Sequence, residues 1–309
     1  MNAAKLYLAP GLRIHQLAEG HWQFVMLSSA FSIKCPEQLL RSVLQAEGKL
    51  SRDEWIASLR QEFDATALGG FIDSLLARGI LCESASGPAS AADAWLYALT
   101  NTRQNPHAPA FDAAAHPLYL HGTGVLRDKL ASLAQDSGFV CTDDAARAAM
   151  FVLLADQPQH DDFRAANRDL VLAQEKPALF AWLDGAAARL LRVVPRATGC
   201  FECLHHRMRA SKQFFREYDA ASSGQALWHV QELPPPLLQA QHLATVTLMH
   251  AGAMLAGQVL DLHQNCLLEC NVLQGTEKLA QVLKLPRCPH CGNGNANLPF
   301  APAYDFKGM

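Results

Sequence analysis

Hydrophobic and polar residues alternate along the first part of the chain and predict a small β-sheet. Residues 11–18 and 21–29 alternate on either side of the turn Glu19-Gly20, as the two strands of a β-hairpin do. Residues 30–34, AFSIK, continue the alternation and predict a short third strand. In that strand Phe31 and Ile33 fall on one side and Ser32 on the other.

Apolar residues then recur at helical spacing, which predicts three helices. The first covers 36–48 and begins with a proline, which suits an early helical position. The second covers 51–63 and opens with Ser-x-x-Glu, the spacing of a capping box. Strands followed by three short helices indicate a winged-helix-like α+β module, to which we assign residues 1–83. The third helix begins at residue 65 and ends at Gly79, with one apolar face formed by Leu68, Phe71, Ile72, Leu75 and Leu76.

The pattern is interrupted at 84–116, which is rich in Ser, Ala, Gly and Pro and is interpreted as a linker. From Pro117 onward apolar strands alternate with helices, which predicts an α/β domain over 117–309 with a parallel sheet covered on both faces. An apolar stretch at 242–260 is expected to be a buried helix. The expected strands are 117–124, 139–143, 148–156, 177–185 and 187–195, and the helices between them are 125–138 and 161–176.

The composition of the chain disfavours nucleic-acid-binding, membrane-spanning and secreted proteins. The formal charge of −3 and the isoelectric point near 6.5 disfavour nucleic-acid binding, although Arg207, Arg209 and Lys212 form a local basic group. No apolar run reaches the length of a membrane span, and the N-terminus lacks the pattern of a secretory signal. We therefore expect a cytoplasmic protein whose nine cysteines are thiols, a setting in which paired cysteines favour metal binding.

Two Cys-x-x-Cys pairs are the most specific chemical signal in the chain. Each pair brings two sulfur atoms close together, and the two pairs supply the four thiolates of a closed tetrahedral zinc site. Such a site would be structural, with one zinc ion per chain. A thioredoxin-like redox pair and a chance spacing remain the alternatives. The four cysteines are Cys200, Cys203, Cys288 and Cys291.

Two further cysteines, Cys266 and Cys270, are spaced i and i+4 in the segment NCLLEC. On a helix this spacing would place both on one face, from which they could reach a metal. The simpler interpretation is that they are small apolar core residues.

A glycine-rich turn follows the strand 117–121 and precedes a helix, as in a dinucleotide-binding fold. Gly122 and Gly124 occupy the first two glycine positions, but Arg127 replaces the third. Asp143 and Asp144 lie where a ribose-binding carboxylate would be expected. We interpret the turn as vestigial, with a working ATP site as the alternative.

No motif of a self-sufficient enzyme is present. The chain has neither a Gly-x-Ser-x-Gly elbow nor a His-Glu-x-x-His helix, and no cysteine outside the two pairs is flanked by an activating base. We therefore do not expect this chain to be catalytic alone.

In the order of these parts, the sequence resembles the ThiF-like partner proteins of azoline-forming peptide synthetases, a group that includes the B subunit of the microcin B synthetase. The resemblance rests on the module at 11–82, the degenerate nucleotide-type domain from Pro117, and the segments PRATGCFECLHHRMRAS and LPRCPHCG. It implies a scaffold that binds the leader of a ribosomally made precursor peptide and presents it to a YcaO cyclodehydratase. It also implies a homodimer and, in some systems, a flavin-dependent dehydrogenase that oxidises azolines to azoles.

In that family the leader adds as an extra strand beside the third strand of the module, against its third helix. Carried onto this sequence, the resemblance implies a peptide-binding site at Phe31, Ser32, Ile33, Phe71, Ile72, Leu75 and Arg78. Plain core packing is the alternative for each apolar member.

Two other functions compete with this one. The first is an ATP-dependent adenylating enzyme of the ThiF type. The second is a DNA-binding winged helix, which is disfavoured because the third predicted helix contains Asp73 and only one basic residue, Arg78.

Overall fold

The computed structural model describes residues 4–9, 12–25, 30–84, 113–158, 160–213, 216, 218–219, 237–255, 266–271 and 274–292. Nearly all of the predicted linker 84–116 therefore lies outside the described residues, as does part of the predicted helix 242–260. None of the helices in the described ranges is both long and apolar enough to cross a membrane.

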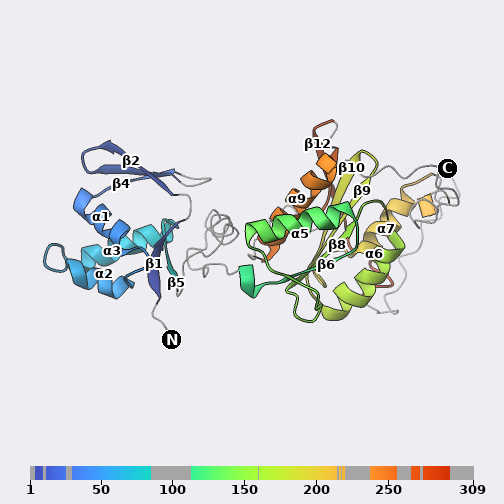
Figure 1. The fold of residues 1–309 in the computed structure, drawn as a ribbon, viewed down its shortest axis with the longest axis horizontal. Coiled ribbons are helices and arrows are strands. Elements are labelled where there is room, and N and C mark those ends of the chain that lie inside the picture. Colours follow the sequence, from blue (N-terminus) through green and yellow to red (C-terminus); the bar gives the residue numbers. More distant parts are fainter. Residues whose placement is uncertain are drawn as a thin grey trace, which may run out of the picture.

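The N-terminal unit contains the three predicted strands and the three predicted helices (Figure 1). The strands form an antiparallel sheet in the order β2-β3-β4. The capping box is confirmed: the Ser51 side chain accepts from the Glu54 backbone, and the Glu54 carboxylate accepts from the Ser51 N–H. The elements are β2 (Arg13–Ala18), β3 (His21–Val25), β4 (Ala30–Lys34), α1 (Glu37–Ala46), α2 (Arg52–Leu59) and α3 (Ala65–Ala77).

A second small sheet in this unit was not predicted. Strand β1 (Lys5–Leu8) pairs antiparallel with β5 (Leu81–Ser84), which follows the third helix. Helix α3 ends just before Gly79, as predicted, because Gly79 adopts a positive φ of 66° and the chain turns back, with the Ile80 N–H donating to the Leu75 carbonyl at 2.9 Å. The two partners lie far apart in sequence, so local pattern could not pair them.

The C-terminal sheet has seven strands in the order β12-β11-β10-β9-β8-β6-β7. Strands β6, β7, β8 and β9 are parallel, as predicted, but β10, β11 and β12 are antiparallel additions, so the prediction of a parallel sheet was wrong for this half. The reason is the connection at Gly185, where φ is +60° and the chain turns directly from β9 into β10. A connection this short can join only antiparallel neighbours. The strands are β6 (Leu118–His121), β7 (Cys141–Thr142), β8 (Met150–Ala155), β9 (Ala178–Asp184), β10 (Ala187–Val193), β11 (Cys266–Asn271) and β12 (Thr276–Gln281).

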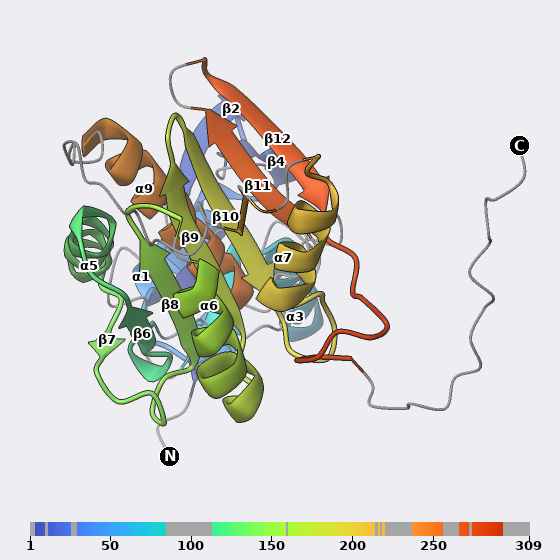
Figure 2. The ribbon, with the colours of Figure 1, turned by 90° about the vertical axis from the view of Figure 1, so that its right-hand side faces the viewer.

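Helices cover both faces of this sheet (Figure 2). Helices α5 (Val125–Ser137) and α9 (Leu237–Leu255) pack on one face. The other face is covered by α6 (His160–Ala166), a π-helical segment at Asn167–Leu172, and α7 (Phe201–Ala210). Strand β8 is buried at every position, which explains why its sequence is a continuous apolar run rather than an alternating one.

Cys266 and Cys270 lie on strand β11, so the alternative in which they share one helical face does not apply. The i, i+4 spacing places two residues on one face of a strand as well as on one face of a helix, so the pattern could not distinguish the two. Cys270 belongs to the core beneath α9, as expected for a small apolar residue.

The core beneath α6 and α7 contains a buried histidine, His160. Its ring contacts Trp182, Phe201 and Tyr218 with centroids 5.5–5.9 Å apart, and its Nδ1 shares a hydrogen bond of 3.1 Å with the Tyr218 hydroxyl. Burial, aided by the nearby charge of His205, lowers the pKa of His160 to about 4. The ring is therefore neutral in the folded protein near pH 7.

This histidine predicts an acid-sensitive stability. Its folded pKa lies below the ordinary value of 6.5, so its contribution is present above about pH 6.5 and is lost as the pH falls toward 4. Between pH 7 and pH 5 this residue should lower the free energy of unfolding by about 2 kcal/mol. Urea unfolding of the wild type and of His160→Phe at both pH values measures the difference. Equal acid losses in the two proteins would contradict the assignment.

Candidate functional site

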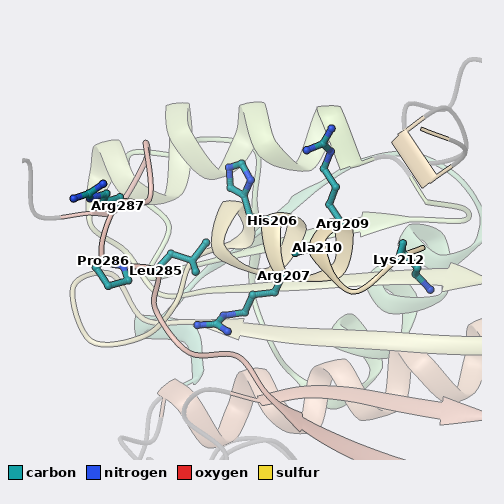
Figure 3. A pocket seen from close by; sticks show the side chains of 8 residues that line it. All are labelled: His206, Arg207, Arg209, Ala210, Lys212, Leu285, Pro286 and Arg287. Carbon is teal, nitrogen blue, oxygen red and sulfur yellow. The ribbon is translucent and has the colours of Figure 1, made fainter. Parts of the chain in front are cut away.

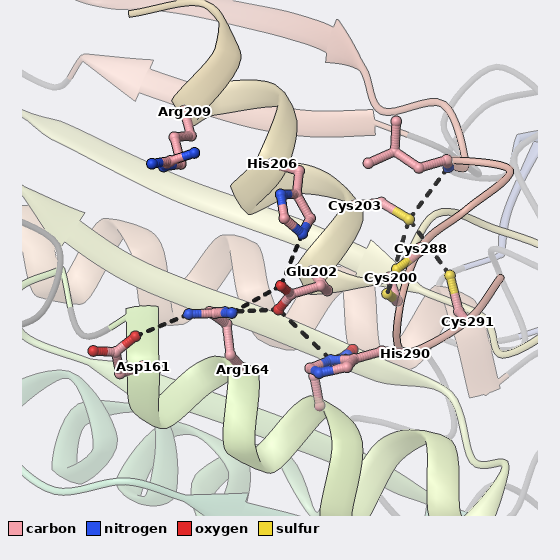
Figure 4. A network of polar contacts seen from close by, with 12 residues as sticks. Asp161, Arg164, Cys200, Glu202, Cys203, His206, Arg209, Cys288, His290 and Cys291 are labelled. Carbon is pink, nitrogen blue, oxygen red and sulfur yellow. Dashed lines mark hydrogen bonds and ion pairs between the residues drawn. The ribbon is translucent and has the colours of Figure 1, made fainter. Parts of the chain in front are cut away.

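The structure brings the four paired cysteines into one cluster (Figure 4). Cys200 and Cys203 lie at the start of α7, and Cys288 and Cys291 lie in the loop that follows β12. The sulfur atoms are 3.9 Å apart for Cys200 and Cys203, 3.6 Å for Cys200 and Cys288, and 3.4 Å for Cys203 and Cys291. With Zn–S bonds of about 2.3 Å, a tetrahedral site has sulfurs about 3.8 Å apart. The donor set and its spacing therefore fit a tetrahedral metal ion.

Backbone contacts fix the loop that carries the second pair. The Gly292 N–H donates to the Cys288 carbonyl at 2.9 Å, and the Leu285 N–H donates to the Cys203 sulfur at 3.4 Å. A side chain at Gly292 would lie 2.5 Å from the Cys288 carbonyl oxygen, so this turn requires glycine. Such N–H···S contacts stabilise a thiolate, as second-shell groups of metal sites do.

The arrangement of the two pairs differs from an isolated redox pair. The sulfurs are 3.4–3.9 Å apart, so no disulfide joins them, and each pair lies against the other rather than alone. Hydrogen bonding from the neighbouring thiols holds the pKa of Cys203 below its usual value and raises that of Cys200. In the absence of a cation the neighbouring thiols share protons unequally. A bound cation would take the place of those protons.

A buried carboxylate, Glu202, lies between the two cysteines of the first pair in sequence and connects the cluster to α6. It is 1% exposed and accepts two hydrogen bonds from Arg164, at 2.7 and 2.9 Å. His206 and His290 lie 3.1 and 3.6 Å from its oxygens (Figure 4). Burial opposes its ionisation, but the hydrogen bonds and charge of Arg164, aided by the two histidines, outweigh burial and lower the pKa of Glu202.

The turn at Gly122 and Gly124 has the shape expected of a nucleotide-binding turn, but a carboxylate of the protein occupies its anion site. Gly122 and Gly124 adopt φ values of 117° and 101°, and a side chain at either would collide with Leu154 or Asp156. The Asp156 carboxylate accepts from the N–H groups of Val125 and Leu126 at 2.7 and 2.8 Å. These are the first N–H groups of α5, the groups that bind phosphate in nucleotide folds. The protein's own carboxylate therefore satisfies them.

The surrounding cleft, of about 960 Å³, carries mainly negative charge. Arg127, its one arginine, lies 3.8 Å from the Asp128 carboxylate. An acidic lining disfavours a nucleotide phosphate. The acidic residues that line the cleft are Asp128, Asp143, Asp162 and Asp169.

Strand β4 forms an edge of the N-terminal sheet. It pairs with β3 on one side, and no second partner strand is present among the described residues. Exposure alternates along the strand, with Phe31 and Ile33 partly buried and Ser32 exposed, as the sequence predicted. Arg78, at the end of α3, lies with its guanidinium 5.5 Å from the centre of the Phe31 ring. The strand and the helix end thus meet at Phe31.

The predicted peptide-binding residues of α3 include both core and surface positions. Ile72 and Leu75 are fully buried and have no surface to offer a peptide in this conformation. Phe71 is partly buried and Arg78 is exposed. The positions available to a ligand beside β4 are therefore Phe71 and Arg78, together with Phe31, Ser32 and Ile33.

The local basic group lines a second cleft of about 880 Å³ beside the cysteine cluster (Figure 3). The side chains of Arg207, Arg209 and Lys212 point in different directions rather than toward one centre. Two are already engaged: Arg207 donates to the Leu283 carbonyl at 2.8 Å, and Arg209 pairs with Asp219 at 2.9 Å. The cleft lacks the convergent geometry of a phosphate site, but its positive charge lies next to four potential thiolates.

Comparison with known proteins identifies the fold. No protein-family model and no curated protein sequence matches the chain. Among solved structures, a heterocyclase in complex with substrate and cofactor matches with a TM-score of 0.69 and 18% identity, and the heterocyclase TruD with 0.70 and 16%. Each match covers 94% of this chain but only 40% and 43% of the respective heterocyclase. The MccB protein of E. coli matches with a TM-score of 0.57 and 11% identity, over 94% of this chain and 97% of MccB.

These likenesses establish a shared mixed α/β fold, and the identities are too low to carry function directly. The chain spans less than half the length of the two heterocyclases. It is a counterpart of one part of those proteins, and of nearly the whole of MccB.

Proposed function

We propose that this chain is the scaffold subunit of an azoline-forming peptide synthetase, which binds the leader of a precursor peptide and activates a separate YcaO cyclodehydratase. The observation that carries the proposal is the edge of β4 beside the end of α3, which has no second partner strand within the described ranges, in a chain whose fold matches part of two heterocyclases. Residues 1–83 would act as a winged-helix-like recognition module, 84–116 as a linker, and 117–309 as a degenerate ThiF-like domain.

The two edges of the N-terminal sheet differ in their suitability for a guest strand. On β2 the register shifts between Gln16 and Ala18, and Leu17 at the shift is 52% exposed. A bulge of this kind disrupts an edge for further pairing. Strand β4 pairs with β3 in an unbroken register from Ala30 to Lys34. A leader strand would therefore add to β4.

The backbone of β4 indicates which groups would bind the guest. The Cys35 N–H donates to the Gly20 carbonyl, so the alternation of an antiparallel ladder directs the N–H groups of Ile33 and Phe31 toward β3. The backbone groups of Ser32 and Lys34 then face the free edge. Ser32 would act through its main chain, and Arg78 would attract an acidic residue of the leader.

The cysteine cluster would hold one structural zinc ion. All four positions would be filled by protein, so the ion would stabilise the fold and leave no place for substrate. Four thiolates and Zn²⁺ have a net charge of −2, and the basic cleft that includes Arg287, next to Cys288, would offset that charge. The expected partners are the precursor leader, the YcaO subunit, a second copy of this chain and, where azoles are formed, a flavin-dependent dehydrogenase, all in the cytoplasm.

The alternative is an ATP-dependent adenylating enzyme. The observation in favour of this alternative is the likeness to MccB, whose structure has also been solved with ATP. The hydrogen bonds from the start of α5 to Asp156, and the acidic cleft around them, favour the scaffold over this enzyme.

Leader binding tests the proposed function through one backbone group. Ser32→Pro removes an N–H that faces the free edge without removing a bond to β3, so it should weaken binding of the leader at least about tenfold. Ser32→Ala keeps that N–H and should bind like the wild type. Fluorescence anisotropy with the labelled leader of the precursor encoded beside this chain measures both.

Gln16→Pro on the opposite edge is the matched control. Its partner Trp22 directs its backbone groups toward β4, so the Gln16 N–H faces away from β3, and leader affinity should be unchanged. Full affinity in Ser32→Pro, with Phe31→Asp and Ile33→Asp also unaffected, would place the leader elsewhere and overturn the proposal.

Exchange of labelled pyrophosphate into ATP separates the scaffold from the adenylating enzyme. We expect no exchange above background by the chain alone, because Asp156 occupies the phosphate-binding N–H groups. Exchange that disappears in Gly124→Ala would instead identify an adenylating enzyme.

Metal analysis tests the zinc assignment. After dialysis against a chelator we expect one zinc per chain, because a closed four-thiolate site releases its ion slowly. The double variant Cys288→Ser/Cys291→Ser should lose the zinc and unfold at a lower urea concentration, whereas Cys141→Ser, an exposed thiol outside the cluster, should keep it. A zinc-free wild type with unchanged stability would refute a structural metal.

A further inference from the structure

Three metal-binding side chains converge on the opposite face of the C-terminal sheet from the cysteine cluster. Cys270 on β11 and Glu277 on β12 are direct cross-strand partners, so their side chains lie on the same face. The Cys270 sulfur is 3.8 Å from a Glu277 carboxylate oxygen. His242 on α9 completes the group, with one donor atom of each residue within 4.8 Å of the others.

The position of the group makes it independent of the cysteine cluster. Cys270 packs in the core beneath α5 and α9, whereas Cys200, Cys203 and Cys288 pack in the core beneath α6 and α7. The sheet separates these two cores. One metal ion cannot be shared between the groups.

The donor set matches a particular class of ion. A histidine nitrogen, a thiolate and a carboxylate suit a borderline divalent metal such as Zn²⁺ or Co²⁺ better than Mg²⁺ or Ca²⁺. In a tetrahedral site, M–S and M–O bonds of about 2.3 and 2.1 Å place sulfur and oxygen about 3.6 Å apart, close to the 3.8 Å observed. The thiolate and the carboxylate together carry two negative charges, which balance one divalent cation.

A simpler interpretation is that the Cys270 thiol donates a weak hydrogen bond to Glu277. That bond would not account for His242, to whose ring no hydrogen bond or ion pair is assigned among the described residues. Cys270 is 2% exposed and Glu277 is exposed, so the group reaches from the core to the surface. Solvent can therefore approach the position that three protein ligands would leave open.

We propose that His242, Cys270 and Glu277 form a second metal site, which binds one divalent transition-metal ion through three protein ligands and keeps a fourth position open to water or to a thiol. Three ligands and an open position are typical of exchangeable or reactive metal sites, in contrast to the closed cysteine cluster. The proposal does not depend on the function proposed above.

Cobalt titration of the full chain tests this site. The protein is first dialysed against a chelator and its zinc content measured, and Co²⁺ is then added while thiolate-to-cobalt absorption is recorded. We expect one additional Co²⁺ per chain with a charge-transfer band. Cys270→Ser should abolish the band, and His242→Ala should weaken cobalt binding at least about tenfold.

Two further variants keep the test independent of folding. Glu277 is exposed, so Glu277→Gln should leave the fold intact and still weaken cobalt binding about tenfold while the band persists. Cys266→Ser makes the same chemical change as Cys270→Ser on the same strand and face, and should bind like the wild type. The proposal is overturned if the wild type takes up no additional cobalt, if the band survives in Cys270→Ser, or if Glu277→Gln binds cobalt as tightly as the wild type.

Discussion

The contact between the first turn of α7 and the loop after β12 is the constraint on which the C-terminal unit depends. This loop leaves the edge of the sheet after Gln281 and is anchored by few apolar side chains, chiefly Val282 and Leu285. The four sulfur atoms therefore connect the loop after β12 directly to the first turn of α7, in addition to the pairing of β11 with β10. Four buried thiols stabilise the fold little without a cation, since each thiol is only a weak hydrogen-bond donor.

The Glu202 network extends this link inward. A buried carboxylate is costly unless it is paired and hydrogen-bonded, and Glu202 has both a bidentate arginine and two histidines. One of those histidines, His290, lies between the cysteines of the second pair, and Asn167 connects it to the α7 backbone through Phe201. The π-helical segment, α7 and the loop that carries Cys288 and Cys291 thus hold one another in register, and the sequence offers no local signal for such a network.

The sequence predicted those elements that are determined by interactions between neighbouring residues. The capping box, the strand alternation of AFSIK and the spacing of the cysteine pairs each follow from neighbouring residues, and the structure contains all three. Pairings between distant segments were missed, namely β1 with β5 and the β11-β12 hairpin on β10. The sequence also could not show that Asp156 would cap α5, because a single aspartate after a strand is common. The convergence of His242 with Cys270 likewise depends on how α9 crosses the sheet.

The two glycines and the capped helix together show that the turn between β6 and α5 has a structural role of its own. Gly122 and Gly124 are required by their backbone conformation and by the close approach of Leu154 and Asp156, whether or not a phosphate binds. In an active nucleotide site the first N–H groups of the helix await an external anion, and the helix end is incompletely satisfied until the anion arrives. Here an internal carboxylate accepts hydrogen bonds from two of these N–H groups. The turn is therefore required as a rigid connection between β6 and α5. A glycine motif of this kind indicates the geometry of that connection and does not by itself indicate a bound ligand.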